Sequence, residues 1–438
     1  MPAGPSQAAT APLPTEFVAP ATPREPAGRA TIRLGTIRLG IVGCGAFARF
    51  SAEQYRRLSA VTVAAVADVN PDAAHRAAKT LGAGVVDPEM LLVSPDIDVV
   101  YLATPPSMHH RQARAALRAG KHVIVEKPLA TTLADAQELE AVAARQGLVC
   151  VANLVERYNP LAEVMRRLIE SRILGGLIHG LFLNEAADEG LAPEHWFWDR
   201  EKSGGIFVEH GVHFFDLVAY WLGQGTVVSA ARSVRPPAGA EEDGNGAVEQ
   251  VYRPVEEQVS CTCRYPYDGW AGHTQSLIPE ALRRDPHWGV LFHFEHGFHQ
   301  PSRMDRQELR LVFERGEVRL YDWVPTHGFL RALVDEESAE ILGRMLPGSV
   351  VRITARHDEE ERHVRGRFHD FESTMMVEIS FTTGLEKLAL YAKTVHDLAE
   401  DQFARVRNPL HMRRLTEADS VACVAMACEA DRLALDAG

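Results

Sequence analysis

Short apolar runs alternate with helical patterns over the first third of the chain. The apolar runs are short enough for buried strands, and they occupy 39–42, 61–67, 98–103, 122–125 and 148–153. Amphipathic stretches that predict helices separate them, over 48–58, 71–81, 108–119 and 132–146. Strands that alternate with helices predict an α/β domain built on a parallel, doubly wound sheet. Ligands bind such sheets beyond the carboxyl ends of the strands, which here are Gly43, Asp68, Thr104 and Lys127.

A glycine-rich turn follows the first strand. It reads Gly43-Cys44-Gly45-Ala46-Phe47-Ala48, a G-x-G-x-x-A pattern between a strand and a helix. Gly43 permits the tight turn, Gly45 lets backbone approach a pyrophosphate, and the small Ala48 lets helix and strand pack closely. The helix N-terminus then offers unpaired N–H groups and a favourable dipole to an anion. The pattern predicts a dinucleotide site, although it is weak by itself.

An acidic residue ends the second strand. Asp68 stands about 20 residues beyond the glycines, where a carboxylate accepts hydrogen bonds from an adenosine ribose. No arginine follows Asp68 directly to receive a 2′-phosphate, which favours NAD over NADP, although Arg76 is near enough to keep NADP as the alternative. Asp68 as a plain turn-opening residue is the other interpretation.

The remaining two thirds carry a different pattern. Alternation at 308–313 and 318–320, around Glu314-Arg315-Gly316-Glu317, predicts a β-hairpin. Helices are predicted from near Val208 to 222, over 386–405 and over 416–433, the last opening with a Thr-x-x-Asp capping signal. The segments 235–250 and 266–288 are typical of loops, and 326–370 is charged and irregular.

Composition limits the partners. The chain has 438 residues and a net charge of −13, which argues against nucleic acid and anionic membranes. No apolar run approaches the roughly 20 residues of a membrane helix. Six scattered cysteines predict a reducing, cytoplasmic compartment. Residues 1–36, rich in Ala and Pro, are predicted to be a disordered tail.

Several motifs in order make the chain resemble the Gfo/Idh/MocA family, named for glucose–fructose oxidoreductase, inositol dehydrogenase and a rhizopine catabolism protein. After the glycine loop come ADVNP at 67–71, ATPPSMH at 103–109, EKPLA at 126–130, ERYNP at 156–160 and SGGIFVEHGVHFFDLVAYWLG at 203–223. The EKP segment together with the GG…GVH..D segment is far more restrictive than the glycine loop.

The resemblance implies a two-domain enzyme. It predicts a Rossmann domain over 37–155 and an α+β domain over 156–438, with a large, open, mainly antiparallel sheet and terminal helices that pack back on the core. It implies a homodimer or homotetramer and a dinucleotide held by the loop residues Gly43, Gly45, Ala46, Phe47 and Ala48, and by Asp68, Thr104, Pro105, His109, Glu126 and Lys127.

It also implies a catalytic set of Lys127, Glu209 and His213. Glu209 stands where the family usually has Asp, and its longer side chain displaces the carboxylate. Positions 209 and 213 lie one helical turn apart, so Glu209 is expected to orient the His213 imidazole. His213 then exchanges a hydroxyl proton while Lys127 polarises the oxygen. A buried structural role for His213 and a cofactor clamp for Lys127 are the alternatives.

Five further residues are candidates for contact with substrate. Trp198 and Asp199 offer an aromatic face beside a carboxylate, which suits a sugar or polyol, although apolar packing explains Trp198 equally well. His210, Arg157 and Asn159 complete the set.

His293, His296 and His299 recur at every third position, but strand geometry turns His296 away from the other two. We therefore expect no metal centre, and one of the three facing the substrate.

These patterns predict an NAD(P)-dependent oxidoreductase that interconverts an alcohol and a ketone on a sugar, cyclitol or related hydroxylated small molecule. Redox-neutral, NAD-dependent glycoside cleavage is the second hypothesis, and a non-catalytic NAD-binding regulator is the third. The presence of Lys127 and His213 weighs against the third.

Overall fold

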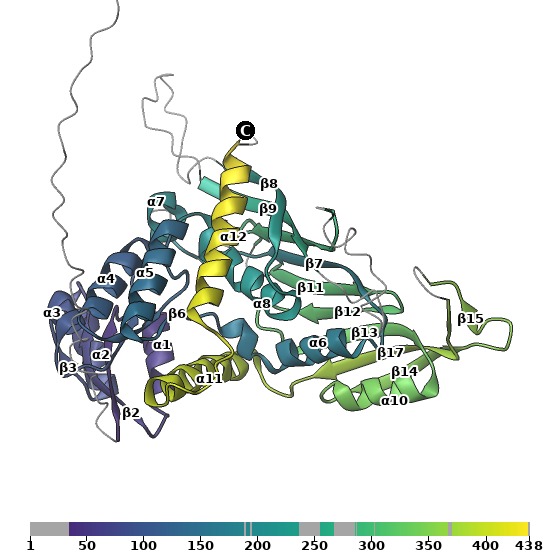
Figure 1. The fold of residues 1–438 in the computed structure, drawn as a ribbon, viewed down its shortest axis with the longest axis horizontal. Helices are drawn as coiled ribbons and strands as arrows, with labels where there is room; N and C mark the ends of the chain where they lie inside the picture. The colour runs from purple at the N-terminus through teal and green to yellow at the C-terminus, as the bar shows by residue number, and fades with distance from the viewer. Residues whose placement is uncertain are drawn as a thin grey trace, which may run out of the picture. The chain divides into compact units, whose positions relative to one another are not determined.

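The computed structural model describes residues 35–187, 190–192, 195–235, 255–266, 285, 287–301, 303–366 and 370–436. The described residues pack as one unit around two large sheets (Figure 1). The predicted tail at 1–36, apart from residues 35 and 36, and most of the predicted loops at 235–250 and 266–288 lie outside the described residues.

The first sheet has six parallel strands in the order β3-β2-β1-β4-β5-β6. The strands are β1 (Ile37–Val42), β2 (Val61–Ala67), β3 (Gly84–Val85), β4 (Val99–Leu102), β5 (His122–Val125) and β6 (Cys150–Ala152). The predicted parallel sheet is confirmed, and its carboxyl edge carries the residues that follow β1, β2, β4 and β5. The strand order changes direction at β1 and β4, which is where doubly wound sheets bind ligands.

Five helices connect these strands, namely α1 (Ala46–Tyr55), α2 (Pro71–Leu81), α3 (Pro88–Val93), α4 (Pro106–Arg118) and α5 (Leu133–Gln146). Local sequence explains their ends. The Asn70 and Thr132 side chains accept backbone N–H groups at the starts of α2 and α5, and Gly82 and Gly147 end the same helices in the left-handed conformation.

The second sheet has nine strands in the order β14-β17-β13-β12-β11-β7-β10-β9-β8. Its pairs are antiparallel except for β10 with β7, so the predicted mainly antiparallel sheet is confirmed. The strands are β7 (Leu177–Glu185), β8 (Thr226–Arg235), β9 (Val255–Tyr265), β10 (Val290–Gly297), β11 (Arg306–Phe313), β12 (Gly316–Tyr321), β13 (His327–Val334), β14 (Val350–Arg356) and β17 (Met375–Thr382).

The segment 326–370 is more regular than its charged sequence suggests. It contains β13, β14, helix α10 (Glu336–Met345) and β15 (His363–Val364), which pairs with β16 (Phe371–Glu372). Strand β14 lies at the sheet edge with nearly all of its residues exposed, so it lacks the alternation that reveals a half-buried strand.

One face of the large sheet holds the core of the second domain. Phe182 of β7 stacks on Phe214 of α8 (Val212–Leu222), with ring centroids 3.5 Å apart, and Phe294 of β10 meets Phe215. Glycine is required at position 180, because a Cβ there would collide with the Phe292 ring. Upstream of the sheet, η1 (Val155–Tyr158) and α6 (Pro160–Ser171) connect the two sheets.

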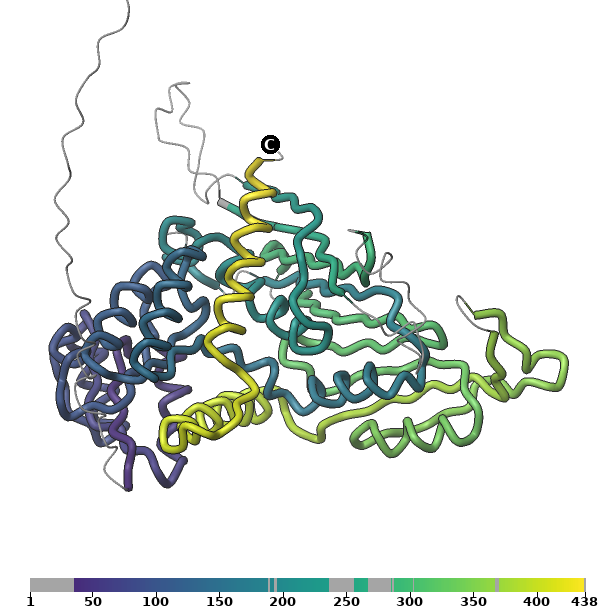
Figure 2. Tube along the Cα trace, in the orientation of Figure 1, coloured from purple at the N-terminus to yellow at the C-terminus, as the bar shows by residue number. Residues whose placement is uncertain are grey.

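The last two helices return to the parallel sheet, as the family resemblance implies (Figure 2). Tyr391 of α11 (Lys387–Arg407) packs on Phe47 and Phe50 of α1, with centroids 5.7 and 5.4 Å away. Helix α12 (Glu417–Asp436) contacts α5, α8 and β8. Within the described ranges, no helix combines the length and apolar character needed to cross a membrane.

Candidate active site

The glycine loop has the shape of an anion cradle. Gly43 has a φ of +94°, and a Cβ there would collide with the Ala103 carbonyl oxygen, so only glycine fits. Gly45 occupies the N-cap of α1, where no side chain of the described residues caps the helix and no acid stands in its first turn. A Cβ on Gly45 would meet nothing within 4 Å, which leaves open space before the helix N-terminus. These features fit the pyrophosphate of a dinucleotide.

Asp68 is fixed beside this loop. The Cys44 N–H donates to Asp68 Oδ2 at 2.7 Å, and the Asn70 N–H donates to Oδ1 at the same distance. A carboxylate has about four acceptor positions, so two remain for the hydroxyls of a ribose. The residues at this end of the site therefore fit NAD.

Other residues predicted to bind the cofactor mainly shape the sheet edge. His109 is fully buried, and its ring nitrogens lie 2.7 Å from the Pro128 oxygen and 2.8 Å from the Thr104 oxygen. Burial lowers the pKa of His109 to about 4. His109 thus joins the loops after β4 and β5, and its prediction as a cofactor contact is corrected. The Thr104 hydroxyl likewise donates to Gln112 Oε1 at 2.6 Å, and Pro105 only leads into α4.

Glu126 lies one residue before the predicted catalytic lysine. Its Oε1 accepts from the Tyr101 hydroxyl and, at 2.8 Å, from Asn153 Nδ2. Burial raises the pKa of this carboxyl to about 7, against these hydrogen bonds, which lower it. The ring of Phe47 packs on α11, so only its backbone N–H is placed to serve the loop.

Lys127 and Glu209 form the ion pair at the centre of the site. The Lys127 ammonium donates to the Glu209 carboxylate and, at 3.1 Å, to the Glu209 backbone oxygen. Glu209 belongs to η3, a π-helical turn over Phe207–Gly211 that runs directly into α8. The prediction that Glu209 orients His213 is wrong in this geometry, because the carboxylate turns to Lys127 instead. Single π-helical turns inside helices occur often at functional sites.

The turn is set up by the two glycines before it. Gly204 and Gly205 both have positive φ, and a Cβ on Gly204 would lie 2.7 Å from Val208 Cγ1. The Glu256 carboxylate of β9 accepts the Ile206 N–H at 2.7 Å and so caps the start of the turn. The large sheet thereby fixes the segment that carries Glu209.

His213 stands one turn further on, at the start of α8. It is 5% exposed, and its Nδ1 is enclosed with no hydrogen-bond partner among the described residues. Burial, and then the positive charge of Lys127, hold the pKa of His213 well below its usual value. A neutral imidazole beside an ammonium can accept a proton from a hydroxyl group.

His296 is one of the three histidines of which the sequence predicts that one faces the substrate. Its Nδ1 lies 2.9 Å from His210 Nδ1, and its ring is fully buried among Phe207, Phe215 and Phe294. His293, on the opposite face of β10, is exposed and contacts the Thr262 hydroxyl at 2.9 Å. The strand alternation that separates these two histidines is confirmed.

Arg157 and Asn159 are occupied by structural contacts. The Arg157 guanidinium donates to Asp216 at 2.7 Å, to the Arg414 oxygen at 2.8 Å and to Asp419 at 3.0 Å. Asn159 accepts the Leu161 N–H at the start of α6 and donates to the Pro325 oxygen. Both predicted substrate contacts are therefore corrected, since these bonds hold the two groups inside the fold.

Trp198 and Asp199 lie in η2 (Trp196–Trp198) and at the N-cap of α7 (Arg200–Ser203). Asp199 accepts the Glu201 N–H and pairs with Lys202 at 2.8 Å, so its carboxylate is engaged locally. The Trp198 ring lies under the Arg235 guanidinium, 5.4 Å from its centroid. This aromatic segment approaches the site through Phe298, whose ring lies 5.1 Å from Phe197 and 5.2 Å from His210.

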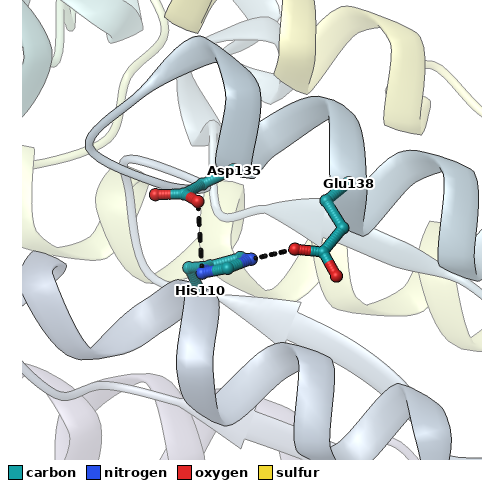
Figure 3. A group of neighbouring side chains, drawn as sticks. All are labelled: His110, Asp135 and Glu138. Atoms are coloured by element: carbon teal, nitrogen blue, oxygen red, sulfur yellow. Dashed lines mark hydrogen bonds and ion pairs between the residues drawn. The ribbon is translucent and has the colours of Figure 1, made fainter.

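A second group of acids and a histidine lies between α4 and α5 (Figure 3). The ring nitrogens of His110 lie 3.3 Å from Asp135 and 2.8 Å from Glu138. Arg114 and Arg118 also reach Glu138. Both imidazole nitrogens are thus engaged by carboxylates, and the arrangement joins the two helices.

Taken together, the fold and the loop define a dinucleotide-binding Rossmann protein with a second, sheet-based domain. Two family models match it, one for the oxidoreductase family with an NAD-binding Rossmann fold over residues 37–154, and one for the GFO/IDH/MocA C-terminal domain over 163–276. The chain belongs to the Gfo/Idh/MocA family of oxidoreductases.

Named relatives include reductases and dehydrogenases. A dTDP-3,4-didehydro-2,6-dideoxy-α-D-glucose 3-reductase of Saccharopolyspora spinosa is 32% identical, over 59% of this chain and 79% of the relative. A 1,5-anhydro-D-fructose reductase of Ensifer adhaerens is 31% identical, over 47% and 63% respectively. A scyllo-inositol 2-dehydrogenase (NAD⁺) of Bacillus subtilis is 27% identical, over 43% and 54%.

Solved structures agree on the fold. A levoglucosan dehydrogenase in complex with NADH and L-sorbose superposes with a TM-score of 0.66 at 17% identity, covering 92% of this chain and 98% of that one. A biliverdin reductase from Synechocystis, in complex with biliverdin and NADP⁺, gives a TM-score of 0.60 at 16% identity. At these identities the likeness establishes the architecture.

Proposed function

We propose that this protein is an NAD-dependent dehydrogenase or reductase that interconverts an alcohol and a ketone on a sugar, cyclitol or related hydroxylated small molecule. Relatives that act on deoxysugar nucleotides, anhydrofructose and inositol support this substrate class. The observation that carries the proposal is the Lys127–Glu209 ion pair beside His213. It lies at the carboxyl edge of the sheet that also presents the glycine loop and Asp68.

The residues divide the chemistry as follows. His213, held neutral by burial and by the nearby ammonium, accepts the hydroxyl proton when an alcohol is oxidised. Lys127 stabilises the negative charge that develops on the same oxygen. Glu209 holds the Lys127 ammonium in place. The nicotinamide of bound NAD supplies the acceptor or donor of the hydride.

Variants of two histidines test the role of His213. His213→Ala is expected to lower turnover of an active polyol by about 10²- to 10⁴-fold, the usual contribution of a general acid–base group. His293→Ala is the matched control, because this exposed histidine lies on the opposite face of β10. Cofactor affinity, measured by tryptophan fluorescence, should stay unchanged in both. Turnover within a few fold of wild type in His213→Ala contradicts the assignment.

A substrate panel distinguishes the proposed activity from its rivals. Formation of NADH from NAD⁺ with a polyol or sugar supports the proposal. Cleavage of a glycoside without net change in NADH indicates redox-neutral chemistry. Stoichiometric NAD binding with no turnover over the whole panel indicates a regulator.

The preference for NAD rests on Asp68. Its carboxylate would repel a 2′-phosphate in the position where it can bond a ribose hydroxyl. Asp68→Asn should therefore raise the KM for NAD⁺ about tenfold and lower the ratio of kcat/KM for NAD⁺ to that for NADP⁺. An unchanged ratio of kcat/KM for the two cofactors in Asp68→Asn refutes this role.

A cytoplasmic location and a homodimer or homotetramer complete the proposal. All six cysteines are free thiols, and the Sγ atoms of Cys261 and Cys263 stay 3.9 Å apart on one face of β9, which suits a reducing compartment. Sedimentation equilibrium of the purified protein tests the oligomeric state, and a monomer at micromolar concentration contradicts it.

A further inference from the structure

His210 and His296 form a histidine pair that the family's catalytic set does not use. Their Nδ1 atoms lie 2.9 Å apart, and their ring centroids are 5.1 Å apart with the rings nearly perpendicular. His210 comes from the π-helical turn that also carries Glu209, whereas His296 comes from β10 of the large sheet. The pair therefore ties the turn that bears the catalytic carboxylate to the sheet beneath it.

The hydrogen bond between the two rings needs one donor nitrogen and one acceptor nitrogen. Burial lowers the pKa of both rings, that of His296 to about 3, so both are neutral near pH 7. A neutral imidazole has one N–H and one acceptor nitrogen. One Nδ1 therefore donates to the other. In the donor ring Nε2 is then unprotonated, and in the acceptor ring Nε2 carries the proton.

The surroundings of His296 decide which ring donates. Its Nε2 is enclosed and has no partner among the described residues, and a Cβ added to Gly211 would lie 3.6 Å from it. A buried N–H without an acceptor is rarer in proteins than an acceptor without a donor. His296 therefore carries its proton on Nδ1 and donates to His210, and its enclosed Nε2 is the bare acceptor.

This donation fixes the state of His210. With Nδ1 accepting, the His210 proton must reside on Nε2. His210 Nε2 is not among the enclosed, unpartnered atoms, and burial, then His296, then the Lys127 ammonium lower the pKa of the His210 ring. The site then offers Lys127 and His210 Nε2–H as two donors, together with His213 as acceptor.

We propose that His296 is a positioning residue that holds His210 as an Nε2–H donor to an acceptor oxygen of the substrate, next to the carbon that is oxidised or reduced. This inference rests on the proposed function and sharpens its substrate class to molecules with an oxygen beside the reacting carbon, such as vicinal diols and hydroxyketones. A monofunctional alcohol leaves the donor unpaired and binds less well.

The proton positions are measured directly in the cofactor-free protein. Two-bond ¹H–¹⁵N correlation spectra of ¹⁵N-histidine-labelled protein report which ring nitrogen is protonated, and His210→Gln and His296→Asn assign the signals. The expected result is Nε2–H for His210 and Nδ1–H for His296. The reverse assignment, or a charged ring at pH 7.5, overturns the proposal.

Kinetics supply the second readout. His296→Phe fills the aromatic enclosure but removes the donor, and we expect the KM for a vicinal diol to rise about tenfold while kcat falls less than about threefold. His296→Asn keeps an N–H near the position of Nδ1 and should restore the KM to within threefold. His293→Phe, on the other face of the strand, is the control. An unchanged KM in His296→Phe, or no rescue by His296→Asn, refutes the role.

The two readouts separate this inference from the function on which it rests. If the spectra show the expected protons and no polyol is turned over, the proposed function fails while the positioning of His210 by His296 stands. If polyols are turned over and the spectra show the reverse protons, the function stands and this inference fails.

Discussion

Two histidine clusters in this protein differ in what surrounds the imidazoles. His210, His213 and His296 lie in an aromatic enclosure, where the Glu209 carboxylate turns to Lys127. His110 lies between two helices, with Asp135 and Glu138 each facing one of its nitrogens. Burial lowers the pKa of all three rings in the first cluster, whereas the His110 ring is partly exposed and has a carboxylate at each nitrogen.

The difference indicates what suits an imidazole to catalysis. A general base needs a ring nitrogen that a substrate hydroxyl can reach, and at His110 both nitrogens already face carboxylates. Burial beside a lysine leaves a ring unprotonated and ready to accept. Identical side chains thus suit the proposed proton transfer in one place and join two helices in the other.

Removal of Lys127 should have the largest effect on the activity and on the pKa values of the enclosed histidines. Lys127→Met is expected to lower kcat by about 10²- to 10³-fold, since it deletes the donor that stabilises a developing oxyanion. It should also raise the pKa of His210 part of the way to its usual value, because the lysine charge is one cause of the lowered pKa, after burial and His296.

Lys202→Met is the matched control, because this lysine is 53% exposed and pairs with Asp199 instead of Glu209. Steady-state kinetics and an NMR titration of the histidines measure both effects. A kcat within fivefold of wild type in Lys127→Met would be incompatible with the role of the ammonium.

Acid should destabilise the enclosed cluster. The folded protein keeps His296 neutral down to a pKa of about 3, whereas an unfolded histidine titrates near 6.5. As the pH falls from 6.5 toward 3, the unfolded chain takes up a proton that the folded protein refuses, so stability is lost. The contribution of His296 to this loss at pH 5 is about 1 to 2 kcal/mol.

Urea unfolding of wild type and His296→Phe at pH 7.5 and pH 5.0 measures the difference. Burial raises the pKa values of Glu126 and Glu156 to about 7 and about 8, so protonation of these two carboxyls adds stability as the pH falls. Their contribution is the same in both proteins and cancels when the two losses of stability are compared. Equal losses of stability in the two proteins would show that His296 is protonated in the fold.

The helix cluster should give the smallest effect. His110→Ala removes partly exposed ion pairs, and exposed pairs contribute about 0 to 1 kcal/mol each. The loss of stability should shrink further in 0.5 M salt, since added ions screen the charges. Turnover should stay unchanged. A large loss of activity in His110→Ala would mean that this cluster is coupled to the chemistry.

The first domain could be predicted from sequence because its signals are local. The strand over 61–67 and the helix over 71–81 are found at the predicted residues, and Asp68 lies beside the glycine loop as expected. Each of these rests on periodicity, a cap or a turn within a few residues. The predicted division at residue 155 stays a prediction, because the described residues on both sides of it belong to one packed unit.

The candidate site was harder to predict because its geometry depends on distant partners. The i, i+4 spacing of Glu209 and His213 suggested that they touch. The Glu209 carboxylate instead pairs with Lys127, which lies 82 positions earlier in the sequence. The contact of His210 with His296 spans 86 positions. Arg157 looked like a ligand because nothing near it in the sequence reveals Asp216 and Asp419 as its partners.

Strand β6 has a consequence for the order in which the protein matures. It is the outer strand of the parallel sheet, and its outward N–H groups, those of Cys150 and Ala152, donate to Glu417 and Ser420 of α12 at 3.0 and 3.1 Å. The hydrogen-bond partners of this strand edge are therefore synthesised more than 260 residues after the strand itself. Until then a nascent chain displays an unpaired strand edge, which other chains can join. Chaperone binding to nascent chains should accordingly persist until α12 has emerged.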